Sequence, residues 1–417
     1  MSNIDREIRY KGKVEGGDSN ASGASGCCLA FSLPYERSIK MKVMKKLIAS
    51  MLVVALACTL TVPAFAYESE LATSEYMKNS LESIQQHENI HLAKIAAETG
   101  EVDAPITTKI LSDLNGNYFE LVEMGTSGYL IFDPQSGKYL EEALDSPSPY
   151  LGLNQNLYYF GPLNYYQLQQ NTFVHTLLPE EYNFSIDVGT DVQSAFNVAL
   201  QRSRSQTDTK VLAAMQIETN SAKSADLQAY FSTTRATNEY IPDYTYIKNA
   251  IYPKNKDGTC GYTAACLILN YWHRHERRII DNSFLDSNGN LKKTGTTLQD
   301  KLLSYGDSND SWGKTIRDAL IAYCNEYGVS ATSTYYITNF DIFAEVGRGR
   351  PVIVFGYFPD SPGQVPTRGK VFHAVTAYGT STSGLTKKLI VHYGWLGYEH
   401  VTLDGGLVGS STQFVLN

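Results

Sequence analysis

Hydrophobic and polar positions change their period along the 417-residue chain. Three short runs within 117–143, NYFELVEM, GYLIFD and KYLEEA, alternate in polarity and are separated by GTS and PQSG. This pattern predicts an antiparallel meander of strands. Helical patterns flank the meander at 67–98 and 191–204. Residues 155–183 are rich in tyrosine and have no clear period, so no element is predicted there. The pattern indicates a small α+β unit over residues 67–204.

The last part of the chain, residues 239–417, has a different order of elements. Helical patterns come first, beginning at Cys260 and continuing with TTLQDKLLSYG and GKTIRDALIAYCNEYG. Strand patterns follow in PVIVFGYF, KVFHAVTAYG, KKLIVHYGW, EHVTLDG and TQFVLN. Helices grouped before antiparallel strands indicate a second α+β domain. Residues 205–238 are rich in Ser, Thr, Gln, Asn and Lys and predict an exposed linker with a short helical piece at VLAAMQIE.

The N-terminal region carries the pattern of an export signal. Residues 41–66 combine a basic stretch, an apolar stretch and a final Ala-Phe-Ala, which predicts a secretory signal peptide cleaved after Ala66. The alternative is an uncleaved membrane anchor, for which the apolar run is short. Residues 1–40 are rich in Gly and Ser and are expected to be an untranslated or disordered extension. The product is then secreted, or held at the cell surface, with no membrane attachment after signal cleavage.

Removal of the signal changes the charge and the cysteine count. The first 66 residues hold nine of the 35 basic and five of the 43 acidic residues, so the remainder carries a net charge of −12. An acidic exported protein is not expected to bind nucleic acid. Three cysteines remain, an odd number that does not suit a disulfide scaffold. Cys266 and Cys324 lie inside apolar helical patterns and are interpreted as buried thiols. We expect a monomer without metal or cofactor.

Cys260 differs from the other two thiols because it follows Asp257-Gly258-Thr259 and begins a helical pattern. A thiol in the first helical turn lies at the positive end of the backbone dipole, which favours the thiolate. A thiolate nucleophile needs a base, and the base needs an orienting partner. His373 in VFHAVTAYG and His392 in LIVHYGW are the candidates for these roles.

The three motifs GTCGYTAACLILNYW, FHAVTAYG and IVHYGW, in this order, resemble the papain-like cysteine peptidases, and within them the streptopain-type and C39-like secreted branches. The resemblance covers about residues 240–400. It implies a papain-like catalytic domain in which a helix carries the cysteine and an antiparallel sheet follows. It also implies that Cys260 is the nucleophile, that His373 is base and acid, and that Trp395 covers the histidine pair. The partner is then a protein or peptide substrate.

The chain departs from the family at two positions. The family places Asn or Asp where His392 stands. A neutral His392 could accept the His373 N–H, so activity should fade when acid protonates it. The family also places Gln six residues before the cysteine. Lys254 occupies that position, with Asn255 beside it, and either side chain could donate a hydrogen bond to the oxyanion.

The meander adds a second resemblance, because GYLIFDPQSGKYLEEALDSPSPY is similar to the pro-region of streptopain-type enzymes. Residues 67–204 would then be an inhibitory pro-domain, removed by a cut within 205–238; the alternative is a plain accessory domain. The leading hypothesis is a secreted cysteine peptidase made as a zymogen. Two alternatives stay open: a thiol amidohydrolase acting on cell-wall peptides or peptide leaders, and a catalytically decayed surface-binding module.

Overall fold

The computed structural model describes residues 87–178, 180–217, 227, 230–232, 235–255, 259–307, 313–336, 342–356, 373–383 and 386–417. By its contacts the chain divides into a unit of residues 1–73 and a unit of residues 74–417, and every described residue belongs to the second. The predicted extension and signal peptide lie outside the described residues. Among the helices that are described, none is both long and apolar enough to cross a membrane.

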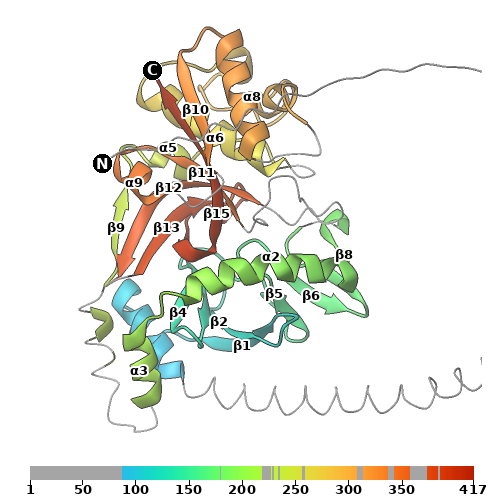
Figure 1. The fold of residues 1–417 in the computed structure, drawn as a ribbon. Helices are drawn as coiled ribbons and strands as arrows, with labels where there is room; N and C mark the ends of the chain where they lie inside the picture. The colour runs from blue at the N-terminus through green and yellow to red at the C-terminus, as the bar shows by residue number, and fades with distance from the viewer. Residues whose placement is uncertain are drawn as a thin grey trace, which may run out of the picture. The chain divides into compact units, whose positions relative to one another are not determined.

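The described strands join into one mixed sheet, which Figure 1 shows running from the N-terminal strands to the C-terminal ones. Its order is β10-β15-β11-β12-β13-β14-β4-β3-β2-β1-β5-β6-β7-β8, and β9 pairs with β12. Only the β1–β5 pair among these is parallel. The strand bounds are β1 (Thr107–Ser112), β2 (Tyr118–Glu123), β3 (Tyr129–Asp133), β4 (Lys138–Ala143), β5 (Leu157–Tyr159), β6 (Tyr165–Gln169), β7 (Thr172–His175), β8 (Phe184–Ser185), β9 (Thr237–Tyr240), β10 (Ala331–Tyr336), β11 (Val352–Gly356), β12 (Ala374–Ser383), β13 (Thr386–His392), β14 (Val401–Asp404) and β15 (Val408–Leu416).

Helices accompany both ends of the sheet, and residues 87–99 are also helical. The α-helices are α2 (Ile186–Arg204), α3 (Thr209–Ile217), α5 (Thr245–Lys248), α6 (Cys260–His275), α7 (Leu298–Leu303), α8 (Gly313–Glu326) and α9 (Ile342–Gly347), and the 3-10 helices are η1 (Glu180–Tyr182), η2 (Asn282–Phe284) and η3 (Gly405–Leu407). The α+β class predicted from the sequence is therefore confirmed.

The meander strands β2, β3 and β4 are buried on both faces, which explains why their alternation includes so many large side chains. In β2, Phe119 packs against Phe196 of α2, and Figure 1 shows α2 lying across these strands. The next residue, Glu120, faces the opposite side, where His87 and His91 of the first described helix contact it. Successive strand residues point to opposite faces, so α2 and helix 87–99 each cover one of them.

The tyrosine-rich segment 155–183, for which no element was predicted, contains β5, β6, β7 and η1. Short strands of three to five residues leave too few alternations for a period to be visible in the sequence. The predicted linker 205–238 also holds more structure than expected. The helical piece predicted at VLAAMQIE is observed as α3. The segment is not simply exposed, because Val211, Leu227 and Phe231 within it are buried against the face of helix 87–99.

The C-terminal part is built around α6, which is buried from Cys260 to Trp272. This helix packs against β11 and β12 and against α5, α7 and α8. Burial on all sides explains its nearly continuous run of apolar residues. The sheet of this part continues into the N-terminal meander, because β14 pairs with β4 through Thr402 opposite Glu142 and Leu403 opposite Glu141.

Candidate active site

Cys260 is the first residue of α6, as the sequence predicted. Its side chain is buried, and its Sγ accepts a hydrogen bond from the backbone N–H of Ala374 at 3.4 Å. The long helix aligns its peptide dipoles toward this sulfur, which favours the ionised form. The fold thus brings the thiol, across 114 residues of chain, to the residue that follows His373.

His373 lies immediately before β12 and is buried. Neither ring nitrogen has a hydrogen-bond partner among the described residues. The ring is instead held between two aromatic side chains: Tyr182 stacks on it with centroids 6.3 Å apart, and Trp395 meets it edge-on at 5.3 Å. Burial, with a smaller contribution from His175, lowers the pKa of His373 to about 3. His373 is therefore a neutral imidazole in the residue before Ala374, whose N–H contacts the Cys260 sulfur, and among the described residues no hydrogen bond joins the imidazole to the thiol.

His392 is the last residue of β13 and pairs with Thr376 of β12. Its Nδ1 accepts the backbone N–H of Gly394 at 2.8 Å, so in the neutral ring the proton is on Nε2. Burial lowers the pKa of His392 to about 3. The ring packs edge-on against Tyr252. In the described part of the chain no hydrogen bond or ring contact joins His392 to His373.

The tautomer of His392 changes the role that the sequence suggested for it. With Nδ1 occupied by Gly394, the remaining nitrogen is a donor and cannot accept the His373 N–H. Gly394 has a φ of +75°, and a Cβ added there would lie 3.2 Å from Cγ2 of Thr263. Glycine is therefore required in the HYGW motif both for its backbone conformation and for close packing on the first turn of α6.

The two oxyanion candidates are placed differently. Lys254 is exposed. Asn255 is half-buried, and its Oδ1 accepts the hydroxyl hydrogen of Thr259 at 3.0 Å. Thr259 directly precedes Cys260, so the Asn255 carboxamide is anchored at the N-terminal end of α6. Of the two, Asn255 has the fixed position that an oxyanion donor needs.

Residues of the predicted unit 67–204, called the N-terminal part from here on, reach the candidate site. The sequence did not indicate this. Tyr182 of η1 stacks on His373, and His175 of β7 packs edge-on against Trp395 at 6.1 Å. His175 is itself fixed, because Nδ1 accepts the N–H groups of Leu177 and Leu178 and Nε2 donates to the carbonyl of Leu163. Both residues lie in the tyrosine-rich segment without periodicity, so no local pattern marks them.

A second contact with the N-terminal part lies at Tyr393, between His392 and Gly394. Its hydroxyl donates to Glu141 of β4 at 3.0 Å. Glu141 is fully buried and also accepts hydroxyl hydrogens from Tyr129, Tyr159 and Tyr165. Burial raises the pKa of Glu141 although these four donors oppose the shift. The motif that carries His392 is thus tied to the meander by a buried carboxylate.

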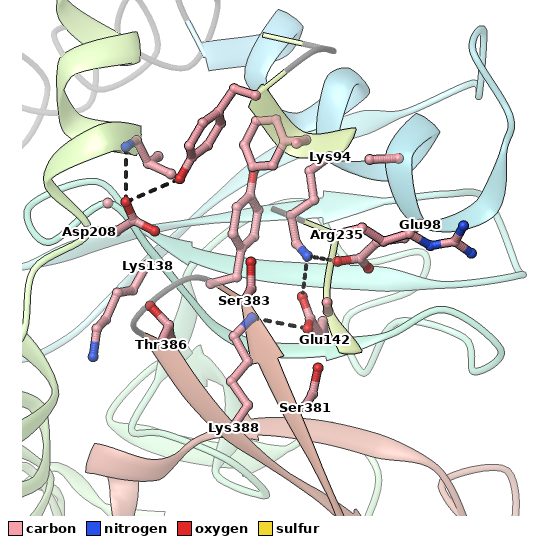
Figure 2. Close-up of a pocket in the computed structure, with 17 residues that line it drawn as sticks. Lys94, Glu98, Lys138, Glu142, Asp208, Arg235, Ser381, Ser383, Thr386 and Lys388 are labelled. Carbon is pink, nitrogen blue, oxygen red and sulfur yellow. Dashed lines mark hydrogen bonds and ion pairs between the residues drawn. The ribbon is translucent and has the colours of Figure 1, made fainter. Parts of the chain in front are cut away.

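Charged side chains of β4 and β13 also pair near this contact, and they border a cavity that helix 87–99, α3 and β12 line as well (Figure 2). Lys388 donates to Glu142 at 3.0 Å, Lys94 lies 2.9 Å from the other oxygen of Glu142, and Lys138 pairs with Asp404 at 3.0 Å. The cavity has a volume of about 40 Å³, enough for a few water molecules. None of the five predicted site residues lines it, so it is a feature of the contact rather than a substrate site.

Cys266 and Cys324 are buried free thiols. Burial raises the pKa of Cys266 well above its usual range and that of Cys324 to about 12. Among the residues that the structure describes, no group of three or more His, Cys, Asp or Glu side chains is arranged to hold a metal ion.

Comparisons with known proteins give distant structural likenesses. No protein-family model matches the chain, and no curated protein matches it. A solved structure titled as a "putative C39-like peptidase" from Bacillus anthracis aligns with 43% of this chain and 98% of its own, at 12% identity and a TM-score of 0.25. The chain is thus distantly similar to a protein described as a peptidase, and the roles of its residues depend on their own geometry.

Proposed function

We propose that the chain is a secreted cysteine peptidase made as a zymogen, and that it cleaves peptide bonds through Cys260 and His373. The observation that carries the proposal is the 3.4 Å contact between the Cys260 Sγ and the N–H of Ala374. It joins a helix-start thiol to the residue after a buried neutral imidazole. It supports the pairing because a thiol nucleophile needs an imidazole or another base close enough to take its proton.

The chemistry follows from these two groups. His373 takes the thiol proton, and the Cys260 sulfur attacks the carbonyl carbon of the substrate. The negative charge then develops on the carbonyl oxygen, where the Cys260 N–H and the Asn255 carboxamide would donate hydrogen bonds. His373 returns the proton to the leaving amine, the C–N bond breaks, and a thioester remains. Water, deprotonated by His373, hydrolyses the thioester and restores the thiol.

The zymogen assignment rests on Tyr182 and His175. These side chains come from the predicted pro-domain and lie against His373 and Trp395. While Tyr182 stacks on His373, a substrate cannot use that face of the ring. We propose that cleavage within 205–238 and departure of the N-terminal part free His373 to turn toward the Cys260 sulfur.

The test compares the intact chain with the chain cleaved by limited proteolysis in 205–238. A fluorogenic peptide should be hydrolysed after cleavage and hardly before it. The Cys260→Ala variant should be inactive, and the Cys266→Ala variant should match the parent. Equal hydrolysis by the Cys260→Ala protein would refute the mechanism, and equal rates before and after cleavage would refute the zymogen.

Export is tested separately by N-terminal sequencing of the product in the culture medium. Cleavage after Ala66 gives a chain that begins at Tyr67. Retention of residues 41–66 in the mature protein would contradict the signal peptide.

A further inference from the structure

Gln299 is a buried residue of α7, and its side chain contacts the first turn of α6, which begins at Cys260. Its Nε2 donates to Oγ1 of Thr263 at 2.7 Å and to Oγ1 of Thr259 at 3.2 Å. The two threonines flank Cys260 in the sequence. A buried carboxamide therefore spends both of its donor hydrogens on hydroxyls next to the nucleophile.

These contacts fix the direction of a hydrogen-bond chain. Thr259 Oγ1 accepts from Gln299 and donates its own hydrogen to Oδ1 of Asn255, 3.0 Å away. Asn255 Oδ1 is then an acceptor, so the Nδ2 group of the same carboxamide is turned away from Thr259. The donor direction runs from Gln299 through Thr259 to Asn255, and hydrogen bonds aligned in this way polarise one another.

The direction matters because an oxyanion requires N–H groups and is repelled by a carbonyl oxygen. The two ends of a carboxamide have nearly the same shape, so only its hydrogen-bond partners decide which end faces the reacting group. Thr259 is also the residue before α6, yet its hydroxyl makes no cap hydrogen bond to the helix. This hydroxyl contributes to the network with Gln299 and Asn255 in place of capping.

We infer that Gln299 is a positioning residue, acting through Thr259, that holds the Asn255 carboxamide with its N–H groups toward the developing oxyanion. The inference rests on the proposed peptidase function. It assigns to α7 a part of the oxyanion site that a glutamine before the cysteine would otherwise supply. Gln299 lies 39 residues after Cys260 and does not touch substrate itself.

The experiment compares two reactions of the Cys260 sulfur, both measured on the full-length chain after it has been cut within 205–238. Hydrolysis of a peptide amide creates an oxyanion, whereas alkylation by iodoacetamide displaces iodide and creates none. Gln299→Met removes the donor without introducing a charge, and Thr259→Val breaks the next contact. Each should lower kcat for peptide hydrolysis about tenfold or more, approaching the 10²–10³-fold typical of losing an oxyanion donor. KM and the rate of Cys260 alkylation should stay within about twofold of the parent, since binding and thiolate formation are unchanged.

Two further variants separate positioning from general damage. Thr263→Val removes the other contact of Gln299 while keeping the methyl group that packs on Gly394, so its kcat should equal that of the parent. Thr259→Ser keeps the hydroxyl and should restore the kcat lost in Thr259→Val. Parental kcat in Gln299→Met would overturn the inference, as would a parallel loss of hydrolysis and alkylation. A parent that alkylates but never hydrolyses peptides would instead refute the proposed function, and the inference with it.

Discussion

Tyr182 stacks on His373 with ring centroids 6.3 Å apart and ring planes 18° apart. Trp395 closes another side of the same imidazole, edge-on at 5.3 Å. One of these two aromatic residues comes from the N-terminal part of the chain and the other from the HYGW motif. His373 is thus held by two residues that are 213 positions apart in the sequence, and neither of its ring nitrogens has a hydrogen-bond partner among the described residues.

Removing the stacked ring should expose the site in the uncleaved chain. In Tyr182→Ala we expect iodoacetamide to alkylate Cys260 several-fold faster than in the parent, because His373 loses the ring that stacks on it. The labelled peptide is quantified by mass spectrometry. Tyr158→Ala is the control: Tyr158 is a half-buried tyrosine of the same part of the sheet that packs on Phe160 and Phe173, and it should leave the rate unchanged. Equal rates in both variants would remove Tyr182 from the blocking role.

The three thiols should differ sharply in reactivity. Since burial raises the pKa of Cys324 to about 12 and that of Cys266 well above its usual range, both are almost entirely protonated at pH 7. Cys260 lies at the start of α6 and should be labelled first in the cleaved chain. Mass spectrometry of tryptic peptides after a short pulse of iodoacetamide measures this order. Uniform slow labelling of all three would argue against an activated Cys260.

Replacement of His392 tests which of its contacts matters. Asn at this position can still accept the Gly394 N–H through Oδ1, so His392→Asn should fold as the parent does and keep peptide hydrolysis. His392→Leu leaves that buried N–H without an acceptor and should lower the free energy of unfolding by about 1–3 kcal/mol. Urea denaturation of the two variants provides the comparison. If the Leu variant is as stable as the Asn variant, the hydrogen bond between His392 and Gly394 does not contribute to the free energy of unfolding.

Glu141 should hold the N-terminal part to the HYGW motif. Tyr393→Phe removes one hydrogen bond to a buried carboxylate, which is worth about 1.5–3 kcal/mol. After cleavage in 205–238, the two fragments should therefore separate at a lower urea concentration in Tyr393→Phe than in the parent, as size-exclusion chromatography would report. Tyr398→Phe is a matched control, because its hydroxyl donates to the carbonyl of Pro147, a neutral acceptor, and the expected shift is smaller. The same separation in Tyr393→Phe and the parent would contradict this role of Glu141.

Acid should destabilise the folded, uncleaved protein because its buried histidines become protonated more easily when the chain unfolds. The pKa of His175 is lowered to about 4, and the pKa values of His373 and His392 to about 3, all by burial. An unfolded histidine titrates near 6.5, so the stabilisation is complete above that pH and is lost as pH falls from about 6.5 toward 3–4. Each histidine contributes a slope of up to about 1.4 kcal/mol per pH unit in this window.

Urea denaturation at several pH values between 7.5 and 4.5 measures this dependence. Glu141 acts in the opposite sense, because its raised pKa makes the folded state bind its proton more readily than the unfolded state does. The comparison is therefore made between the parent and His392→Asn, in which Glu141 is unchanged. The variant should lose less stability than the parent over the same interval. Parallel curves would show that His392 is not a buried neutral histidine.

Local patterns predicted the elements that are long or strongly periodic. The meander at 117–143 and the helix that starts at Cys260 were both recognisable, because each repeats its period several times. The strands of 155–183 were not, since they are short and their tyrosines pack as well on either face. In 205–238 the short helical piece at VLAAMQIE was recognisable, but the segment was taken as exposed because its composition is mostly polar, and composition does not show that Val211, Leu227 and Phe231 pack against helix 87–99.

The sequence by itself determined that a thiol begins a helix and that two histidines stand on later strand patterns, since helix starts and strand alternation are properties of neighbouring residues. Only the tertiary structure decided which groups surround them. Tyr182 reaches His373, Glu141 accepts from Tyr393, and Gln299 aligns Thr259 with Asn255 because packing of distant elements brings these side chains within bonding distance. The ring nitrogen of His392 that carries the proton was likewise decided by a turn, through the N–H of Gly394. Such contacts are selected by the shape of the folded core, and a polar side chain in the sequence carries no mark of the partner that burial will give it.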